Sequence, residues 1–177
     1  MDDPILISAP DPNWPALFLA EQTRLLSALP TLLALEHIGS TAVPGLCAKP
    51  VIDMMAAVAE LGDLADSDLA ALGYGLLQTD MKNRLLYVSV ATPDRPRFHL
   101  HIVETATWPT RNERLLRDHL RQHPLDAEAY GMLKLRLAAK FPEDRFAYTR
   151  AKTALIQSMV DRARTARGLP RENVWQD

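Results

Sequence analysis

The first hundred residues carry short apolar runs bounded by glycine and proline, a pattern that is typical of buried strands. The pattern predicts five strands, at 33–39, 51–58, 74–79, 84–91 and 97–103. Two helices are expected among them. One covers 14–29 with Asn13 as its cap, and the other covers 63–72 and stops at Gly73. This half of the chain therefore mixes strands and helices.

The second half of the chain is predicted to be helical. Three helices are expected, at 109–122, 125–141 and 143–167. The predicted fold class is α/β, with a mixed sheet of about five strands, flanking helices and a helical C-terminal part. We expect residues 1–105 to form the α/β core and residues 106–168 to pack on it within a single compact domain. Residues 169–177 are expected to be a tail that is loose from 171 onwards.

Length and composition narrow the class of protein. A chain of 177 residues with 47% apolar residues suits one domain with a proper core. No apolar run approaches the roughly 18 residues that a membrane span needs. The acidic start, Met1–Asp3, lacks the basic residues of a secretory signal. Cys47 is the only cysteine, which excludes an internal disulfide framework. These features predict a cytoplasmic protein with no membrane partner.

Charge is unevenly spread along the chain, although the formal net charge is only −2. Residues 1–100 carry 6 Lys/Arg against 12 Asp/Glu, whereas residues 101–177 carry 14 against 10. The asymmetry fits either two differently solvated surfaces or basic C-terminal helices that help to hold a phosphate-bearing ligand. It is not the strongly basic footprint of a duplex DNA-binding protein, so no duplex nucleic acid is expected as a partner.

The loop between the first two predicted strands carries the main candidate chemistry. Gly39 has no side chain, which lets a ligand approach the backbone there. The hydroxyls of Ser40 and Thr41, with the N–H groups of the loop, can bind phosphate oxygens, and Lys49 can supply a point charge for an anion. Asp53 follows on an apolar strand, where a carboxylate is costly unless it is paired, hydrogen-bonded or bound to a cation.

Histidines form the second set of candidate groups. Strand alternation puts His99 and His101 on one face of a predicted strand, with their Cα atoms about 7 Å apart, and Arg97 shares that face. The two histidines are either metal-binding or catalytic groups, or they pack in a polar cleft. His37 either points towards the loop or is a buried structural residue. The chain has no P-loop spacing and no G-x-S-x-G elbow, so neither class of site is indicated.

Residues 36–53 match the pattern E-H-I-G-S-T-x-V-P-G-L-x-x-K-P-x-I-D in full, and the chain is identified by it as a member of the GrpB family. The resemblance covers about residues 5–165. Further matching segments lie at 11–15, at 99–103, at 117–121, at Tyr130 and Lys134, and at 148–152. The family in turn resembles the nucleotidyltransferase superfamily, where a Gly-Ser motif ends one strand and a D-x-D motif follows. Met55 stands here in place of the second carboxylate.

The resemblance implies roles for particular residues. Asp53 would hold a divalent cation, and His99 or His101 would complete the metal site. Asp53 and His101 would be the catalytic groups. Arg117 lies in one of the matching segments and would contact phosphate. The implied cofactor is Mg²⁺ or Mn²⁺, and a site rich in histidine would also suit Zn²⁺.

The leading hypothesis is a nucleotidyltransferase-like protein that binds a nucleoside triphosphate, or another phosphate-bearing small molecule, and transfers a nucleotidyl group to an unknown acceptor. Met55 favours the alternative of a non-catalytic nucleotide-binding or regulatory module that has lost the second carboxylate. A metal-dependent hydrolase that uses Asp53, His99 and His101 is a third alternative.

Overall fold

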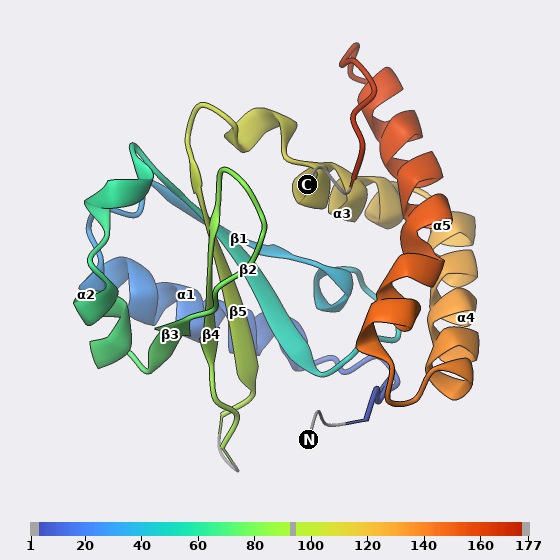
Figure 1. Ribbon diagram of the computed structural model, residues 1–177, viewed down its shortest axis with the longest axis horizontal. Helices are drawn as coiled ribbons and strands as arrows, with labels where there is room; N and C mark the ends of the chain where they lie inside the picture. The colour runs from blue at the N-terminus through green and yellow to red at the C-terminus, as the bar shows by residue number, and fades with distance from the viewer. Residues whose placement is uncertain (1–3, 93–94, 175–177) are drawn as a thin grey trace.

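The computed structural model describes residues 4–92 and 95–174. Within this part of the chain, a five-stranded sheet with strand order β1-β2-β5-β4-β3 forms the centre (Figure 1). The strands are β1 Ala34–Ile38, β2 Val51–Val58, β3 Tyr74–Leu76, β4 Leu85–Ser89 and β5 Arg97–Glu104. β2 and β5 are parallel, and the other neighbouring strands are antiparallel. The sheet is therefore mixed, and the predicted α/β class is confirmed.

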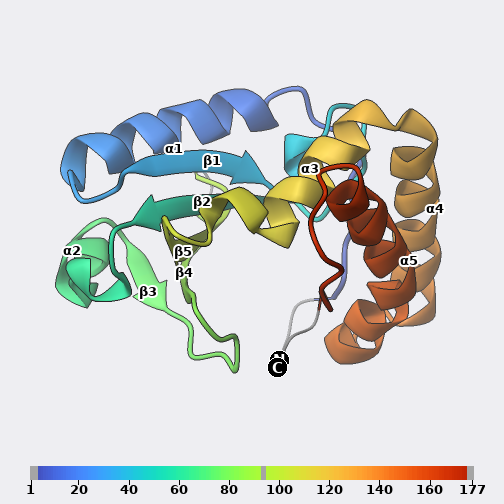
Figure 2. The same cartoon turned by 90° about the horizontal axis from the view of Figure 1, so that it is seen from above.

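Five α-helices accompany the sheet in the described residues. They are α1 Trp14–Ala28, α2 Asp66–Ala71, α3 Asn112–Gln122, α4 Pro124–Lys140 and α5 Arg145–Thr165. α1 runs alongside β1, while α3, α4 and α5 gather at one end of the sheet (Figure 2). The loop between β1 and β2 reaches towards these last three helices. None of the described helices is both long and apolar enough to cross a membrane.

Alternation along the central strands gives the sheet two different faces. Ile52 and Met54 of β2, with Leu100 and Ile102 of β5, are fully buried in one cluster with apolar residues of α1 and α2. The residues between them point to the opposite face. That second set includes Asp53, which faces a space bounded by α3 and α5. The hydrophobic core thus lies on the α1 side, and the candidate site lies on the other side.

The described part of the predicted tail is held against α5 and is not loose. The side chain of Gln157 donates a hydrogen bond to the Glu172 carbonyl, 2.9 Å away, and accepts one from the Val174 N–H, also at 2.9 Å. The Arg164 guanidinium pairs with the Glu172 carboxylate at 2.5 Å. Residues 175–177 of the tail lie outside the described residues.

Two helix starts and one cap differ from the predictions. The helix expected from 109 begins as α3 at Asn112, after a separate 3₁₀ turn over Trp108–Thr110, and the helix expected from 63 begins as α2 at Asp66. The Asn13 side chain makes no capping hydrogen bond, although Pro15 does lie in the first turn of α1. The Asn13 N–H instead donates to Asp11 Oδ1 at 2.8 Å, so the aspartate orders the turn before the helix. α5 does begin with a side-chain cap, which was not predicted, because the Asp144 carboxylate accepts a hydrogen bond from the Ala147 N–H at 2.8 Å.

Candidate functional site

Gly39 shapes the loop between β1 and β2. Its φ of +71° is one that residues with side chains rarely adopt. A Cβ atom added there would lie 2.5 Å from Asp53 Oδ2, so the missing side chain also makes room for that carboxylate. A 3₁₀ turn over Ser40–Ala42 follows directly. The Gly-Ser motif therefore fixes how closely the loop backbone approaches Asp53.

Asp53 forms a pair with His99 on the two central strands. The two residues are register partners of parallel β2 and β5, and His99 Nδ1 lies 3.1 Å from Asp53 Oδ1. The side chain of His99 is 32% exposed and that of Asp53 is 30% exposed. The prediction that Asp53 is buried among its apolar neighbours is therefore wrong, because strand alternation turns it to the open face. A partly solvated carboxylate does not need a permanent cation.

A pocket of about 240 Å³ opens beside this pair, and we call it the lysine pocket. The loop, the central strands and helices α4 and α5 provide its walls. Its lining residues are Gly39, Ser40, Thr41, Ala48, Lys49, Val51, Asp53, His99, Tyr130, Lys134, Tyr148 and Lys152. The pocket thus brings together all the residues predicted to bind phosphate except Arg117.

Lys134 links α4 to the loop. Its side chain reaches inwards, and the residue is only 3% exposed. The ammonium group donates hydrogen bonds to Ser40 Oγ, at 2.9 Å, and to the Cys47 carbonyl. It also lies 4.6 Å from the centroid of the Tyr130 ring, one turn earlier in the same helix. These contacts fix a positive charge against the Gly-Ser motif.

Lys49 and Lys152 both lie against the ring of Tyr148. Lys49 comes from the loop and Lys152 from α5, and their Nζ atoms are 4.9 and 4.2 Å from the ring centroid. An aromatic face attracts an ammonium group by its quadrupole. Tyr148 is 1% exposed, so its position is fixed by packing. The ring therefore gathers two lysines that would otherwise repel each other.

Burial lowers the pKa of all three lysines. Burial and the charge of Lys152 bring the pKa of Lys134 to about 8, and burial and the charge of Lys49 bring the pKa of Lys152 to about 8. Burial and then Arg145 lower the pKa of Lys49. Asp53 offsets only part of the effect on Lys49 and Lys152. Three crowded ammonium groups and one carboxylate make a pocket that favours an anion.

Sequence reasoning did not assign Lys134 and Lys152 to the site, although the sequence contains a signal for both. Each follows a tyrosine by four residues, as Tyr130-x-x-x-Lys134 in α4 and Tyr148-x-x-x-Lys152 in α5. Residues four apart lie on one face of a helix. Because the same spacing occurs on two consecutive helices, it could have predicted that Lys134 and Lys152 both face one pocket.

His101 lines a second cavity, which we call the inner chamber. It has a volume of about 330 Å³ and lies between the sheet and helices α3 and α5. It shares Ser40, Asp53 and Tyr130 with the lysine pocket, but His101 does not line that pocket. His99 lines the lysine pocket and His101 the inner chamber, so the two histidines of β5 lie in the walls of two adjoining cavities.

His101 is neutral at physiological pH. Burial and the positive charge of Arg84 lower its pKa to about 4, and Asp53 and Glu113 offset only part of this. The Nδ1 atom of His101 is buried and has no hydrogen-bond partner among the described residues. The Glu113 carboxylate does not fill that role, since it pairs with Arg84. His101 thus presents an unused hydrogen-bonding atom.

Asp53, His99 and His101 do not assemble as a three-ligand metal group. Within the part of the chain that the structure describes, no three His, Cys, Asp or Glu side chains are arranged to hold an ion. Asp53 and His99 remain together. Mg²⁺ is commonly bound by one or two carboxylates together with water and ligand phosphates. A cation at this pair would therefore need oxygen atoms from the ligand.

The position of the missing second carboxylate belongs to the hydrophobic core. Met55 is the register partner of His101 and is fully buried. It packs in a small apolar cluster with Ile38 and Val103, against which Trp108 lies. It lines neither the lysine pocket nor the inner chamber. A methionine at position 55 is thus matched by the surroundings of the residue.

His37 is a structural residue. Its ring stacks on Phe18 of α1, with the ring centroids 4.8 Å apart, and burial lowers its pKa to about 4. His37 Nε2 lies 2.9 Å from Thr41 Oγ1, and that hydroxyl donates to the Val51 carbonyl at 3.2 Å. The ring nitrogen is therefore the donor in the first contact. These bonds use the Thr41 hydroxyl to brace the loop.

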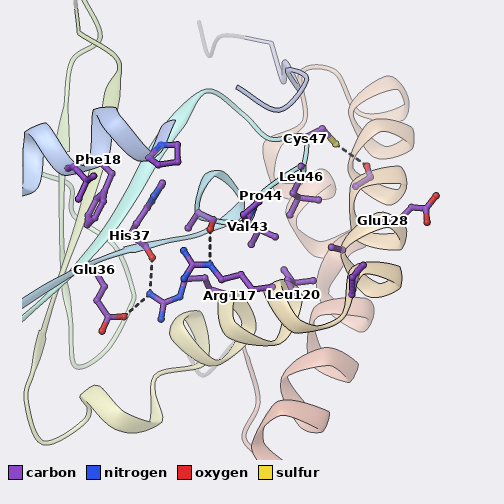
Figure 3. A pocket seen from close by; sticks show the side chains of 18 of the residues that line it. Phe18, Glu36, His37, Val43, Pro44, Leu46, Cys47, Arg117, Leu120 and Glu128 are labelled. Atoms are coloured by element: carbon purple, nitrogen blue, oxygen red, sulfur yellow. Dashed lines mark hydrogen bonds and ion pairs between the residues drawn. The ribbon is translucent and has the colours of Figure 1, made fainter. Parts of the chain in front are cut away.

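Arg117 lies on the other side of the loop and is already paired (Figure 3). Its guanidinium donates to the Glu36 carboxylate at 2.6 Å, to the His37 carbonyl at 2.9 Å and to Asp118 Oδ1 at 2.7 Å. It is 8% exposed. It borders a wide groove of about 1000 Å³ between α1, β1, the loop, α3 and α4. Arg117 therefore positions α3 on β1, and it also lines the inner chamber beside Gly39, Ser40 and Asp53, although it does not line the lysine pocket.

Comparison with known proteins identifies the family of the chain. The family model described as GrpB protein matches residues 4–162. A UPF0157 protein of Streptomyces coelicolor is 38% identical over 160 residues, which are 89% of this chain and 83% of that protein. A UPF0157 protein of Pseudomonas aeruginosa is 36% identical over 169 residues, which are 93% of this chain and 70% of that protein.

The fold also matches a solved structure. The crystal structure of the conserved protein GrpB from Enterococcus faecalis superimposes with a TM-score of 0.81 at 29% sequence identity. The match covers 92% of this chain and 99% of that one. Sequence and fold therefore agree over nearly the whole length, and the chain belongs to the GrpB family.

Proposed function

We propose that this protein binds a nucleoside triphosphate, or another small molecule that carries phosphate groups, in the lysine pocket. The observation that supports this most strongly is the gathering of Lys49, Lys134 and Lys152 around the single carboxylate of Asp53. Burial and mutual repulsion make that arrangement costly. Perturbed groups of this kind are concentrated at functional sites. A phosphate group would remove the repulsion.

The pocket also offers neutral donors beside the lysines. Burial raises the pKa of Tyr130 to about 12, so its phenol stays protonated. The Ser40 hydroxyl lies next to it in the same wall. Charge-assisted hydrogen bonds to phosphate oxygens are roughly twice as strong as neutral ones, and neutral donors add orientation. The lysines would therefore supply most of the affinity, and the hydroxyls would supply position.

Nucleotidyl transfer is the second candidate function, and the Asp53–His99 pair at the wall of the pocket favours it. The acceptor oxygen would form a bond to the α-phosphorus while the bond to the bridging oxygen of pyrophosphate breaks. His99, oriented by Asp53, would take the proton of the acceptor. A non-catalytic module would use the same pocket for binding alone.

A divalent cation would bind in the pocket only together with the phosphate ligand. Asp53 and His99 are the donors that would hold it, and the ligand would provide the remaining oxygens. When bound, such an ion would neutralise part of the phosphate charge. The three lysines are placed to do the same without it. We therefore expect phosphate binding to persist without metal.

Isothermal titration calorimetry with inorganic tripolyphosphate and the four common ribonucleoside triphosphates tests the proposal. Each titration is run with EDTA and again with Mg²⁺, Mn²⁺ or Zn²⁺. Wild type should bind in EDTA, and Lys152→Met should weaken binding about tenfold or more, since a hydrogen bond to a charged group contributes about 1.5–3 kcal/mol. Incubation with candidate acceptors and assay of released pyrophosphate tests the transfer step.

Lys140→Met is the matched control. Lys140 lies at the exposed end of α4, away from the pocket, with its Nζ atom 5.1 Å from the centroid of the nearby Phe141 ring. The substitution removes the same charge from the protein but leaves the pocket intact. Equal losses of affinity in both variants would show a general charge effect. No binding of any of these phosphates to wild type would overturn the proposal.

A further inference from the structure

The amine of Lys152 opens to the lysine pocket. Its Nζ atom lies 4.2 Å from the centroid of the Tyr148 ring and makes no hydrogen bond or ion pair within the described residues. The residue is partly exposed and lines the pocket, and Nζ is not one of the buried, unpartnered atoms of the described chain. A molecule held in the pocket can therefore reach this nitrogen.

The other two lysines of the pocket are less suited to react with a ligand. Lys134 is only 3% exposed and donates hydrogen bonds to Ser40 Oγ and to the Cys47 carbonyl. Burial lowers the pKa of Lys49, but the fall is smaller than that of Lys152. Lys49 and Lys134 are thus the two cations left to hold a phosphate while Lys152 reacts.

Lys152 provides the uncharged amine that a nucleophilic attack requires. Burial, and then the charge of Lys49, lower its pKa to about 8. At pH 7 about one Lys152 amine in ten is therefore uncharged, against about one in three thousand for an ordinary lysine. Desolvation and a neighbouring cation are the usual means by which a lysine is activated to attack a carbonyl carbon.

The size of the pocket limits the class of ligand. Its volume of about 240 Å³ lies below the range of roughly 300–1,000 Å³ that is usual for drug-sized ligands. A phosphate group on Lys49 and Lys134 would leave room for a chain of only a few carbons. The Asp53–His99 pair lies in the same wall and can serve as the acid–base group for a reaction there.

We propose that Lys152 forms a Schiff base with an aldehyde or ketone of a few carbons that carries a phosphate group. This inference rests on the proposed function, because the bound phosphate brings the carbonyl to the amine. The Nζ lone pair attacks the carbonyl carbon, and a proton passes from nitrogen to the carbonyl oxygen to give a carbinolamine. The carbinolamine then loses water as the C=N bond forms, and His99, held by Asp53, relays the protons.

Reductive trapping of the whole protein tests the proposal. Glyceraldehyde 3-phosphate is the probe, sodium cyanoborohydride makes any Schiff base permanent, and peptide mass spectrometry locates the adduct among lysines 49, 82, 134, 140 and 152. Lys152 should react about ten times faster than Lys140 or more, because of its larger uncharged fraction. Glyceraldehyde, which lacks the phosphate, should label Lys152 far more slowly, and tripolyphosphate should suppress the labelling.

Lys152→Arg separates the reaction from phosphate binding. Arginine keeps a permanent positive charge but has no amine that forms a Schiff base under these conditions. The variant should keep tripolyphosphate affinity, measured by calorimetry, within about threefold and lose the phosphate-dependent adduct. Lys140→Arg is the matched control and should keep both. Circular dichroism shows whether each variant has folded, and the position of the adduct in wild type decides the site if Lys152→Arg does not fold.

The outcomes distinguish this inference from the proposed function. Tripolyphosphate binding without an adduct on Lys152 would overturn the Schiff base and leave phosphate binding in place. So would an adduct centred on Lys49 or Lys134, or equal labelling by glyceraldehyde with and without its phosphate. Absence of both tripolyphosphate binding and labelling would remove the proposed function and this inference together. A phosphate-dependent adduct on Lys152 that Lys152→Arg abolishes would support the reaction.

Discussion

Replacing Lys152 by methionine should stabilise the fold while it weakens phosphate binding. Lys152 is held near Lys49 in the lysine pocket, where burial and that neighbour lower its pKa to about 8. Methionine keeps most of the apolar stem and removes the charge. Functional sites contain residues of this kind, which bind the ligand but destabilise the fold, when activity and stability conflict.

The magnitude follows from the pKa. Burial lowers the pKa of Lys152 from 10.5 to about 8, so the charged lysine destabilises the folded state by about 3 kcal/mol. This penalty is complete at any pH where the lysine is charged in both the folded and the unfolded state. Methionine also loses the cation–π contact with Tyr148, whose ring centroid is 4.2 Å from Nζ. That loss offsets about 1 kcal/mol of the stabilisation gained by removing the charge. We expect a net gain of about 1–2 kcal/mol in the free energy of unfolding at pH 7.

The pH dependence gives the sharper test. The folded-state pKa of Lys152 is depressed, so its penalty is complete below pH 8 and fades between pH 8 and about 10.5, as the folded protein releases the proton first. Urea unfolding at pH 7 and pH 10 should show a gain for Lys152→Met that shrinks to less than about 1 kcal/mol at pH 10. Lys140→Met should change stability by less than about 0.5 kcal/mol. A loss of stability at pH 7, or a gain that does not change with pH, would refute the reasoning.

Three further changes test other parts of the site. Gly39→Ala should lower the free energy of unfolding in urea by about 2 kcal/mol or more, because the φ of +71° disfavours a side chain and the added Cβ would clash with Asp53. The loss should be smaller in an Asp53→Ala background, which removes the clash. Met55→Asp should lower stability by about 3 kcal/mol or more without improving Mg²⁺ binding, since it buries an unpaired carboxylate; stronger Mg²⁺ binding would contradict this. Tripolyphosphate affinity, measured by calorimetry from pH 7 to 9.5, should fall above pH 8 as Lys134 and Lys152 lose protons, and a flat profile would exclude them as ligands.

Much of the fold could be predicted because hydrophobic periodicity determines it. The buried strands β2 and β5 lie where apolar runs predicted them, but Asp53 was expected to be buried with its apolar neighbours, whereas strand alternation turns it to the face opposite Ile52 and Met54. Local chemistry was less reliable. Asn13 was expected to cap α1, but the preceding Asp11 orders that turn. Side-chain hydrogen bonds at such positions compete with one another, and sequence pattern alone does not decide between neighbours.

The site was predicted only in part because its two halves are far apart in the sequence. The loop residues and Asp53 lie close together along the chain, so their motif identified them. Lys134 and Lys152 reach the same pocket from α4 and α5, and their approach depends on how those helices pack. Strand alternation placed His99 and His101 on one face of β5, and the two line adjoining cavities that share Ser40, Asp53 and Tyr130.

The charges of the pocket indicate how the site can work with Met55 in place of a carboxylate. A site with two carboxylates binds phosphates indirectly, through cations that the carboxylates hold. Here Lys49, Lys134 and Lys152 supply positive charge directly beside a single carboxylate, Asp53. A carboxylate at position 55 would lie in the apolar cluster of Ile38 and Val103, outside the lysine pocket, and could not hold a cation for a phosphate there. An apolar residue at that position avoids the cost of burying an unpaired charge. Under the proposed function, the three lysines beside one carboxylate would therefore hold phosphate without a bound metal.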